Sequence, residues 1–336
     1  MTITPLILGS GSSGQAISTS FATLKLKFPD LKLALPVQLM RGSSLVEERR
    51  KYEHPVLCIA NPHGLHAQAI LDAEKAGYEA ILCEKPACVN SREVDDLRAV
   101  KVPTAVLHGY RQTWGVQTLK QMIEDRKLGE VISIEGRYWQ ASTAERALIR
   151  NRTGEAASSW KNDTALSGDF DVFLDIATHW MDAASFLHGS VPREIHGWRS
   201  YINAETAHRD SHVQLMANFS GGGRAFGSIS KTVHGSTHHF ELNVIGSLRS
   251  ATWKFLEPDQ LIIGEGRDLS VFTRKDSNFG SRQSPFHAQG WLEGYIEIAH
   301  QLVAEVFHGR TTSYPRLSEN LDLLEALFKT RWNRTA

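Results

Sequence analysis

Short apolar runs alternate with helix-like segments along the first third of the chain. Ile17, Phe21, Leu24 and Phe28 recur at helical spacing, and a second helix is expected over Leu65–Ala76, where Gly77 can act as the C-cap. This alternation is typical of a parallel sheet with helices on both of its faces. The apolar runs predict five strands, at Ile3–Leu8, Leu33–Met40, Val56–Ala60, Ala80–Cys83 and Thr104–Leu107.

Beyond about residue 115 the pattern changes from helical spacing to alternation with period two. After a helix over Gly115–Lys127, the alternation predicts a largely antiparallel sheet, interrupted by a helix over about Asp175–His188. Two amphipathic helices, Trp291–Phe307 and Leu317–Trp332, are expected at the end. The expected strands are Val131–Trp139, Glu194–Tyr201, His212–Phe219, Arg224–Lys231, His239–Ile245 and Ala251–Phe255.

Composition and charge narrow the possible partners. The chain has 336 residues, enough for about two domains, and its 37 basic residues balance 37 acidic ones. A net charge of 0 gives no electrostatic reason to expect nucleic acid or a membrane as a partner. No segment approaches the roughly 20 apolar residues of a membrane span, and no leader sequence is recognisable, so we expect a soluble, cytoplasmic protein. Cys58, Cys83 and Cys88 form no CxxC pair and are expected to be reduced packing residues.

The first candidate site directly follows the first strand. Gly9, Gly11 and Gly14 form a GxGxxG pattern, with Ser12 and Ser13 between the last two glycines, and the pattern opens an amphipathic helix. In this context the glycines permit a tight turn, close approach of a pyrophosphate and helix–strand packing, while the helix N-terminus attracts negative charge. A flexible Gly/Ser loop is the alternative. The pattern favours a Rossmann-type dinucleotide-binding domain over residues 1–115, followed by an α+β domain over residues 116–336 with a mainly antiparallel open sheet and C-terminal helices able to pack back on the first domain.

The end of the second strand bears on the choice of cofactor. A dinucleotide without a 2′-phosphate favours an acidic residue there, whereas this chain has Arg41 and Ser43 in the sequence Met-Arg-Gly-Ser-Ser. An arginine can donate two hydrogen bonds to a phosphate, so these residues indicate NADP in preference to NAD. A solvated surface loop is the alternative.

Two more turns follow the third and fourth strands, at the carboxyl ends where ligands of such sheets bind. The first is Ala60-Asn61-Pro62-His63-Gly64-Leu65-His66, and the second is Glu84-Lys85-Pro86. We expect Ala60, Asn61, His63, His66, Glu84 and Lys85 to contribute to the cofactor site. On its own, Glu-Lys-Pro would be an ordinary exposed loop.

The second domain contains a histidine between two carboxylates. At about 100° per residue, Asp175, His179 and Asp182 project from one side of a helix, beside an apolar stripe. The residues alone leave open a catalytic, a structural or a metal-binding role. No cysteine or third clustered histidine supports a closed zinc site, so no metal is expected.

Taken in order, these motifs resemble the glucose–fructose oxidoreductase / inositol dehydrogenase / rhizopine catabolism (Gfo/Idh/MocA) family across nearly the whole chain. The resemblance implies a nicotinamide-dependent oxidoreductase acting on a sugar, cyclitol or related polyol. It implies proton transfer by Lys85, and it implies that Asp175 and His179 hold and polarise the reacting hydroxyl. Ala177 departs from the family pattern, which usually has glycine there. Further substrate contacts are expected from Arg111, Tyr138, Asp182 and Trp291.

The expected activity is hydride transfer between a substrate carbinol carbon and nicotinamide C4, with NADP preferred over NAD. One alternative is an NAD-dependent glycosidase of the same family that holds its cofactor tightly. Another is a non-catalytic NADP-binding sensor, although such a protein would be expected to lack Lys85 or His179, and both are present. An open sheet in the second domain would leave one face uncovered, so we expect a homodimer or homotetramer formed through that sheet.

Overall fold

The computed structural model describes residues 1–154, 160–201, 209–274 and 290–333. The chain divides into two compact units, which are described separately here. The first comprises residues 1–112, 163–168 and 291–324, and the second comprises residues 113–162, 169–290 and 325–336. Each unit is therefore assembled from separate stretches of sequence, whereas the sequence prediction placed a single boundary after residue 115.

The first unit contains a five-stranded sheet in which every neighbouring pair is parallel, in the order β2-β1-β3-β4-β5. This confirms the predicted parallel sheet. The predicted strand Leu33–Met40 is shortened to two residues, because Lys32 adopts a left-handed conformation and Pro36 has no N–H to donate. The strands are β1 (Ile3–Leu8), β2 (Val37–Gln38), β3 (His54–Ile59), β4 (Ala80–Cys83) and β5 (Thr104–Val106).

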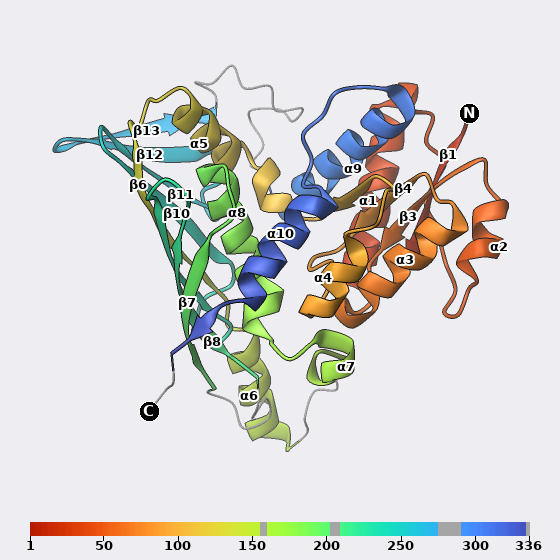
Figure 1. Cartoon of the computed structure of the whole chain (residues 1–336), viewed down its shortest axis with the longest axis horizontal. Helices are drawn as coiled ribbons and strands as arrows, with labels where there is room; N and C mark the ends of the chain where they lie inside the picture. Colours follow the sequence, from red (N-terminus) through yellow and green to blue (C-terminus); the bar gives the residue numbers. More distant parts are fainter. Residues whose placement is uncertain (155–159, 202–208, 275–289, 334–336) are drawn as a thin grey trace. The chain divides into compact units, whose positions relative to one another are not determined.

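Helices from both ends of the chain pack in the first unit. Ile17, Phe21 and Leu24 of α1 share a buried apolar cluster with Ile298 and Leu302 of α9, and Figure 1 shows these two helices side by side. The helices are α1 (Ser12–Lys27), α2 (Leu45–Arg50), α3 (His66–Ala76), α4 (Ser91–Leu97), α7 (Thr164–Ser167), α9 (Trp291–His308) and the first part of α10 (Leu317–Phe328), with short 3₁₀ turns at Pro29–Leu31, His63–Leu65 and Gly109–Gln112.

The second unit is built on a nine-stranded sheet in the order β13-β12-β11-β10-β6-β9-β8-β7-β14. All neighbouring pairs are antiparallel except β6–β9 and β7–β14, which confirms the mainly antiparallel sheet. The strands are β6 (Val131–Trp139), β7 (Glu194–Ser200), β8 (His212–Asn218), β9 (Arg224–Ser230), β10 (His239–Gly246), β11 (Ser250–Lys254), β12 (Gln260–Glu265), β13 (Asp268–Thr273) and β14 (Arg331–Trp332).

Helices α5 (Trp114–Glu124) and α8 (Thr178–His188) lie on one face of this sheet (Figure 1). Two glycines on the sheet make room for Trp180 of α8. A Cβ at Gly227 would lie 2.8 Å from the indole ring, and one at Gly136 would lie 3.1 Å from its Nε1. The same nitrogen donates to the backbone oxygen of Glu241 at 3.3 Å, so α8 is fixed to the sheet by both shape and a hydrogen bond.

Several details of the second unit differ from the sequence prediction. The predicted helix Asp175–His188 is a π-helix over Phe173–Ala177 followed by α8, and α6 (Ser142–Thr153) was not predicted. The last predicted helix ends at Phe328, and Trp332 belongs to β14. β13 was missed because its first four residues are all exposed, so no alternation marks it.

The three cysteines are buried and unpaired, as predicted, and burial raises the pKa of each thiol. Within the described residues, no helix is both long and apolar enough to cross a membrane.

Candidate active site

The glycine loop of the first unit connects β1 to α1. Gly9 has a φ of +122°, and a Cβ there would lie 2.3 Å from the backbone oxygen of Ala60, which follows β3. A Cβ at Gly14 would lie 2.0 Å from the oxygen of Gly9. Both positions therefore require glycine so that the loop can fold back on the strands and on the first turn of α1.

Gly11 has a different environment, because among the described residues no atom beyond its own chain neighbours and helix backbone lies within 4 Å of the position that its Cβ would take. It is the N-cap of α1, and no side chain among the described residues caps that helix there. Gly11 thus faces open space beside the first N–H groups of α1, contributed by Ser12, Ser13 and Gly14. This arrangement fits a dinucleotide pyrophosphate, which needs close backbone approach and N–H donors.

The turn after β2 lies at the same edge of the sheet, since β2 pairs directly with β1. Arg41 is exposed and Ser43 is half-buried, and Gly42 between them has a φ of +85°. The Ser43 N–H donates to the Met40 oxygen at 3.1 Å and closes the turn. The guanidinium of Arg41 is accordingly accessible to an anion in solution.

His66 joins the turn after β3 to the turn after β4. It is fully buried, its Nδ1 lies 2.8 Å from the Pro86 oxygen, and its Nε2 lies 2.8 Å from the Asn61 oxygen. Burial outweighs these two carbonyls and lowers the pKa of His66. His63, 9% exposed, packs edge-on against the His66 ring, so the two predicted histidines form one packed pair.

Glu84 and Lys85 leave the end of β4 in buried positions, 5% and 7% exposed. The hydroxyl of Tyr295, on α9, donates to Glu84 Oε1, and the Lys85 N–H donates to Glu84 Oε2 at 3.1 Å. Burial and the Glu84 charge raise the pKa of Tyr295 well above its ordinary value, which keeps this donor protonated. Tyr295, which the sequence analysis did not select, therefore fixes the carboxylate beside Lys85.

Two of the predicted substrate residues also belong to the first unit. Arg111 is 8% exposed and forms an ion pair with Glu319 of α10, so its guanidinium is already held by a protein carboxylate. Trp291 is 46% exposed at the start of α9, with its ring edge-on to Tyr295 at 5.1 Å between centroids.

In the second unit, Asp175 lies in the π-helical segment and is 9% exposed. Its Oδ2 accepts from Lys161 Nζ at 2.6 Å and lies 2.6 Å from Lys231 Nζ. Lys231 also donates to Asp171 Oδ1 at 2.5 Å. Neither lysine was predicted, because both are distant from the motif in sequence and their residue type carries no signal of this contact.

His179, in the first turn of α8, is half-buried beside Tyr138 of β6, with 6.2 Å between the ring centroids. The Tyr138 side chain is only 2% exposed, and its hydroxyl lies 2.9 Å from His238 Nε2 and accepts from Gln140 Nε2 at 3.1 Å. Burial lowers the pKa of His238. Tyr138 thus joins His179 to a small polar network.

The two remaining motif positions are also buried. Asp182 is 1% exposed on α8, and Ala177 is fully buried in the π-helical segment. The methyl group of Ala177 therefore occupies interior space, where a glycine would have left a gap.

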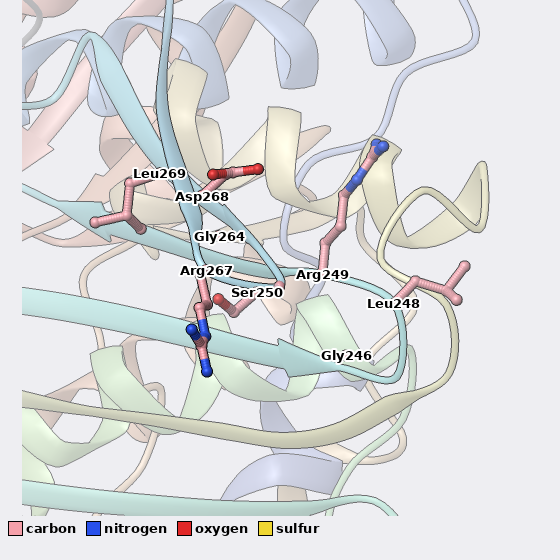
Figure 2. A pocket seen from close by; sticks show the side chains of 9 residues that line it. Gly246, Leu248, Arg249, Ser250, Gly264, Arg267, Asp268 and Leu269 are labelled. Atoms are coloured by element: carbon pink, nitrogen blue, oxygen red, sulfur yellow. The ribbon is translucent and has the colours of Figure 1, made fainter.

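A hollow of about 300 Å³ lies elsewhere in the second unit, at the ends of the β10–β11 and β12–β13 hairpins. Figure 2 shows its two arginines, Arg249 and Arg267, extending in different directions. Arg249 is paired with Glu265 at 2.7 Å. The hollow contains none of the predicted site residues, and its cations do not converge on one ligand.

Known proteins share this architecture. Residues 116–252 match the family model described as the GFO/IDH/MocA C-terminal domain. A levoglucosan dehydrogenase from Pseudarthrobacter phenanthrenivorans is 24% identical over 362 residues, covering 91% of this chain and 90% of that protein. The solved structure of an inositol dehydrogenase homolog from Azotobacter vinelandii, complexed with NAD⁺, has a TM-score of 0.82 at 18% identity and covers 98% of this chain and 94% of that one. A levoglucosan dehydrogenase complexed with NADH has a TM-score of 0.79 at 23% identity, with 97% and 96% covered.

These similarities agree with the order of the motifs. The solved structures share the fold over nearly the full length, and the family model matches the segment that contains Asp175 and His179. The glycine loop, the turn after β3 and the Glu-Lys-Pro turn occur in the parallel-sheet unit, as the resemblance implied. The chain is therefore similar to Gfo/Idh/MocA proteins: residues 116–252 match the model of the family's C-terminal domain, and the solved structures share the fold over nearly the whole chain.

Proposed function

We propose that this protein is a nicotinamide-dependent dehydrogenase that oxidises a carbinol carbon of a sugar or cyclitol. The observation that carries the proposal is the position of Lys85, buried at the carboxyl edge of the same parallel sheet as the glycine loop. At that edge a bound dinucleotide places its reactive ring close to the strand ends. Relatives named for levoglucosan and inositol make these two compounds the first substrates to test.

The chemistry assigns a separate task to each group. A nicotinamide dinucleotide held at the glycine loop would supply the hydride acceptor. Removing hydride from a carbinol requires that the hydroxyl proton leave in or near the same step, and Lys85 accepts it. His179 can donate or accept a hydrogen bond at a substrate oxygen, as an imidazole does near neutral pH. Asp175, held by Lys161 and Lys231, orients the substrate as a fixed acceptor.

The cofactor preference follows from the turn after β2. Arg41 is exposed there beside Ser43, at the sheet edge where the adenosine ribose of a bound dinucleotide would lie. A 2′-phosphate gains a charged hydrogen bond from arginine, so we propose that NADP is preferred over NAD. Relatives have been solved with NAD⁺ or NADH, so this preference would distinguish the chain from them.

The test is a panel of sugars, cyclitols and levoglucosan, each offered with NAD⁺ and with NADP⁺, followed by the absorbance of reduced nicotinamide. Substrate-dependent reduction supports the proposal. Loss of a glycoside without net cofactor reduction would instead indicate the glycosidase alternative. Cofactor binding without turnover of any compound in the panel would favour the sensor alternative.

A further inference from the structure

Lys231 directly follows β9 and is 2% exposed, although it carries a charged group. Its Nζ lies 2.5 Å from Asp171 Oδ1 and 2.6 Å from Asp175 Oδ2. These two carboxylates are four residues apart, at the start of the helical segment that carries His179. One ammonium group therefore connects the sheet to two points on that segment.

Charge explains why a lysine is retained at this buried position. Burial alone would lower the pKa of Lys231, but Asp175 and Asp171 outweigh burial and raise it. The lysine therefore remains charged, and each carboxylate has a cation to compensate it. A buried charge is tolerated only with such partners, and removal of one partner leaves the others uncompensated.

The start of the helical segment is fixed from a second direction. Asp210, just before β8, is 1% exposed and accepts from the Asp171 N–H at 2.8 Å and from the Phe173 N–H at 2.6 Å. Asp210 thus holds the backbone where the segment begins. Its contacts do not reach the Asp175 side chain, which lies in the π-helix that follows.

A π-helical turn is rare and persists where the surrounding contacts determine it, often at functional sites. Here Lys231 contacts residues on both sides of Phe173, the first residue of the π-helix. Its second contact is to Asp175, the carboxylate that the family motif places at the substrate.

We infer that Lys231 is a positioning residue that sets the orientation of the Asp175 carboxylate for catalysis. The inference rests on the proposed function for the role of Asp175, and it adds a residue that the motif does not contain. Lys161 approaches the same Oδ2 from a more exposed position, with a third of its side chain accessible. Lys231 bridges Asp171 and Asp175 from a buried position, 2% exposed.

Lys231→Met alone would leave two carboxylates near a single remaining cation, and this variant could fail to fold. We therefore choose Asp171→Asn as the background and Asp171→Asn with Lys231→Met as the test variant. The background keeps Lys231 on Asp175, while the double variant removes lysine and one carboxylate together and leaves the local charge balanced. A Lys231→Arg variant tests whether another cation restores the contact.

We expect the double variant to lose about 10²-fold in kcat relative to the background, as for a misplacement of about 1 Å at a reacting group, with unchanged dinucleotide affinity. Lys231→Arg should retain much of the turnover. In crystal structures, Asp175 should keep its side-chain orientation in the background and change it in the double variant.

Equal kcat in a folded double variant and its background would overturn the inference, and so would an unchanged Asp175 side chain in the crystal. If the wild type turns over no carbinol, the proposed function fails. The crystallographic comparison still decides in that case whether Lys231 orients Asp175.

Discussion

Two buried carboxylates in this protein are held by different kinds of donor. Glu84 accepts hydrogen bonds from a phenol hydroxyl and a backbone N–H. Asp175 instead contacts two ammonium groups, those of Lys161 and Lys231. Neutral donors fix the direction of Glu84 without adding a cation beside Lys85. The Asp175 carboxylate is held by charged donors, whose hydrogen bonds are shorter and stronger than those of neutral donors.

Lys85→Met tests the proton-transfer role at the residue scale. Methionine fills similar space but cannot accept a proton, so we expect kcat to fall by about 10²–10⁴ while dinucleotide affinity changes little. Single-turnover kinetics on the identified substrate give the rate, and a fluorescence titration gives the affinity. Lys75→Met, at an exposed lysine of α3, is the control. Near-wild-type turnover would reassign the base, with His179 tested next.

Arg41→Ala tests the cofactor preference. One charged hydrogen bond contributes about 1.5–3 kcal/mol, so its loss should reduce the NADP-to-NAD affinity ratio by roughly 10- to 150-fold. Titration of both cofactors into wild type and variant measures the ratio. Arg50→Ala, at an exposed arginine of α2, should leave it unchanged. Equal affinity of the wild type for the two cofactors would show that Arg41 does not select NADP.

At the scale of elements, periodicity located most strands, and the order of the motifs selected the residues of the candidate site. β4 and β6 have the predicted bounds, because each combines a clear apolar or alternating pattern with a turn signal at its end. The predicted strand Leu33–Met40 is only two residues long in the structure. Its sequence is apolar over a longer stretch, but Pro36 has no N–H and interrupts the hydrogen bonding. The Lys231 contacts had no sequence signal, because they arise only when β9 packs beside the motif helix.

The glycine loop offers a matched pair of variants. A Cβ at Gly14 would meet the Gly9 oxygen at 2.0 Å, so we expect Gly14→Ala to destabilise the fold by about 1–3 kcal/mol. A Cβ at Gly11 would have open space around it within the described part of the chain, so Gly11→Ala should leave the melting temperature unchanged while weakening dinucleotide binding at least about tenfold. Thermal melts without cofactor and cofactor titrations separate the two effects. Unchanged cofactor affinity in Gly11→Ala would contradict a pyrophosphate at that position.

An ion pair between Glu305 of α9 and Arg316 gives a pH-dependent prediction. Glu305 accepts two hydrogen bonds from Arg316, at 2.7 and 2.8 Å, and others from Thr312 and Tyr314, and Arg316 foremost lowers its pKa from 4.5 to about 2. A depressed carboxyl pKa stabilises the fold fully above pH 4.5 and loses this effect as the pH falls toward 2.

Glu305→Gln should therefore cost about 1 kcal/mol of unfolding free energy at pH 7, a value reduced for solvent screening of this partly exposed pair. The difference from wild type should shrink between pH 4.5 and the lowest pH at which the protein stays folded. Urea unfolding across this range measures it. Arg316→Gln should reproduce the pH dependence, and a difference that stays constant with pH would exclude the ion pair as its source.

At the scale of the whole molecule, the nine-stranded sheet has two unlike faces. One row of residues paired across the strands faces α5, α8 or the interior, and its apolar members are buried. This row consists of Leu215, Gly227, Gly136, Leu242, Trp253 and Leu261. The paired row on the opposite face is half-buried or exposed, and includes Met216, Phe226, Ile262 and Val271. Apolar side chains on a broad exposed sheet face are typical of an interface between subunits.

We therefore expect a homodimer or homotetramer that buries this face, with at least about 1,000 Å² of total surface for a stable contact. Phe226, 37% exposed, and Val271, 57% exposed, lie on different strands of the face, so Phe226→Lys with Val271→Lys should shift the protein to monomers. The unfolding free energy of each isolated subunit should change little, because both side chains point away from the core. Leu26→Lys, at an 82% exposed position of α1 in the other unit, is the matched control and should leave assembly intact. Light scattering at micromolar concentration measures the molecular mass of each protein in solution. A monomeric wild type would refute assembly through this sheet.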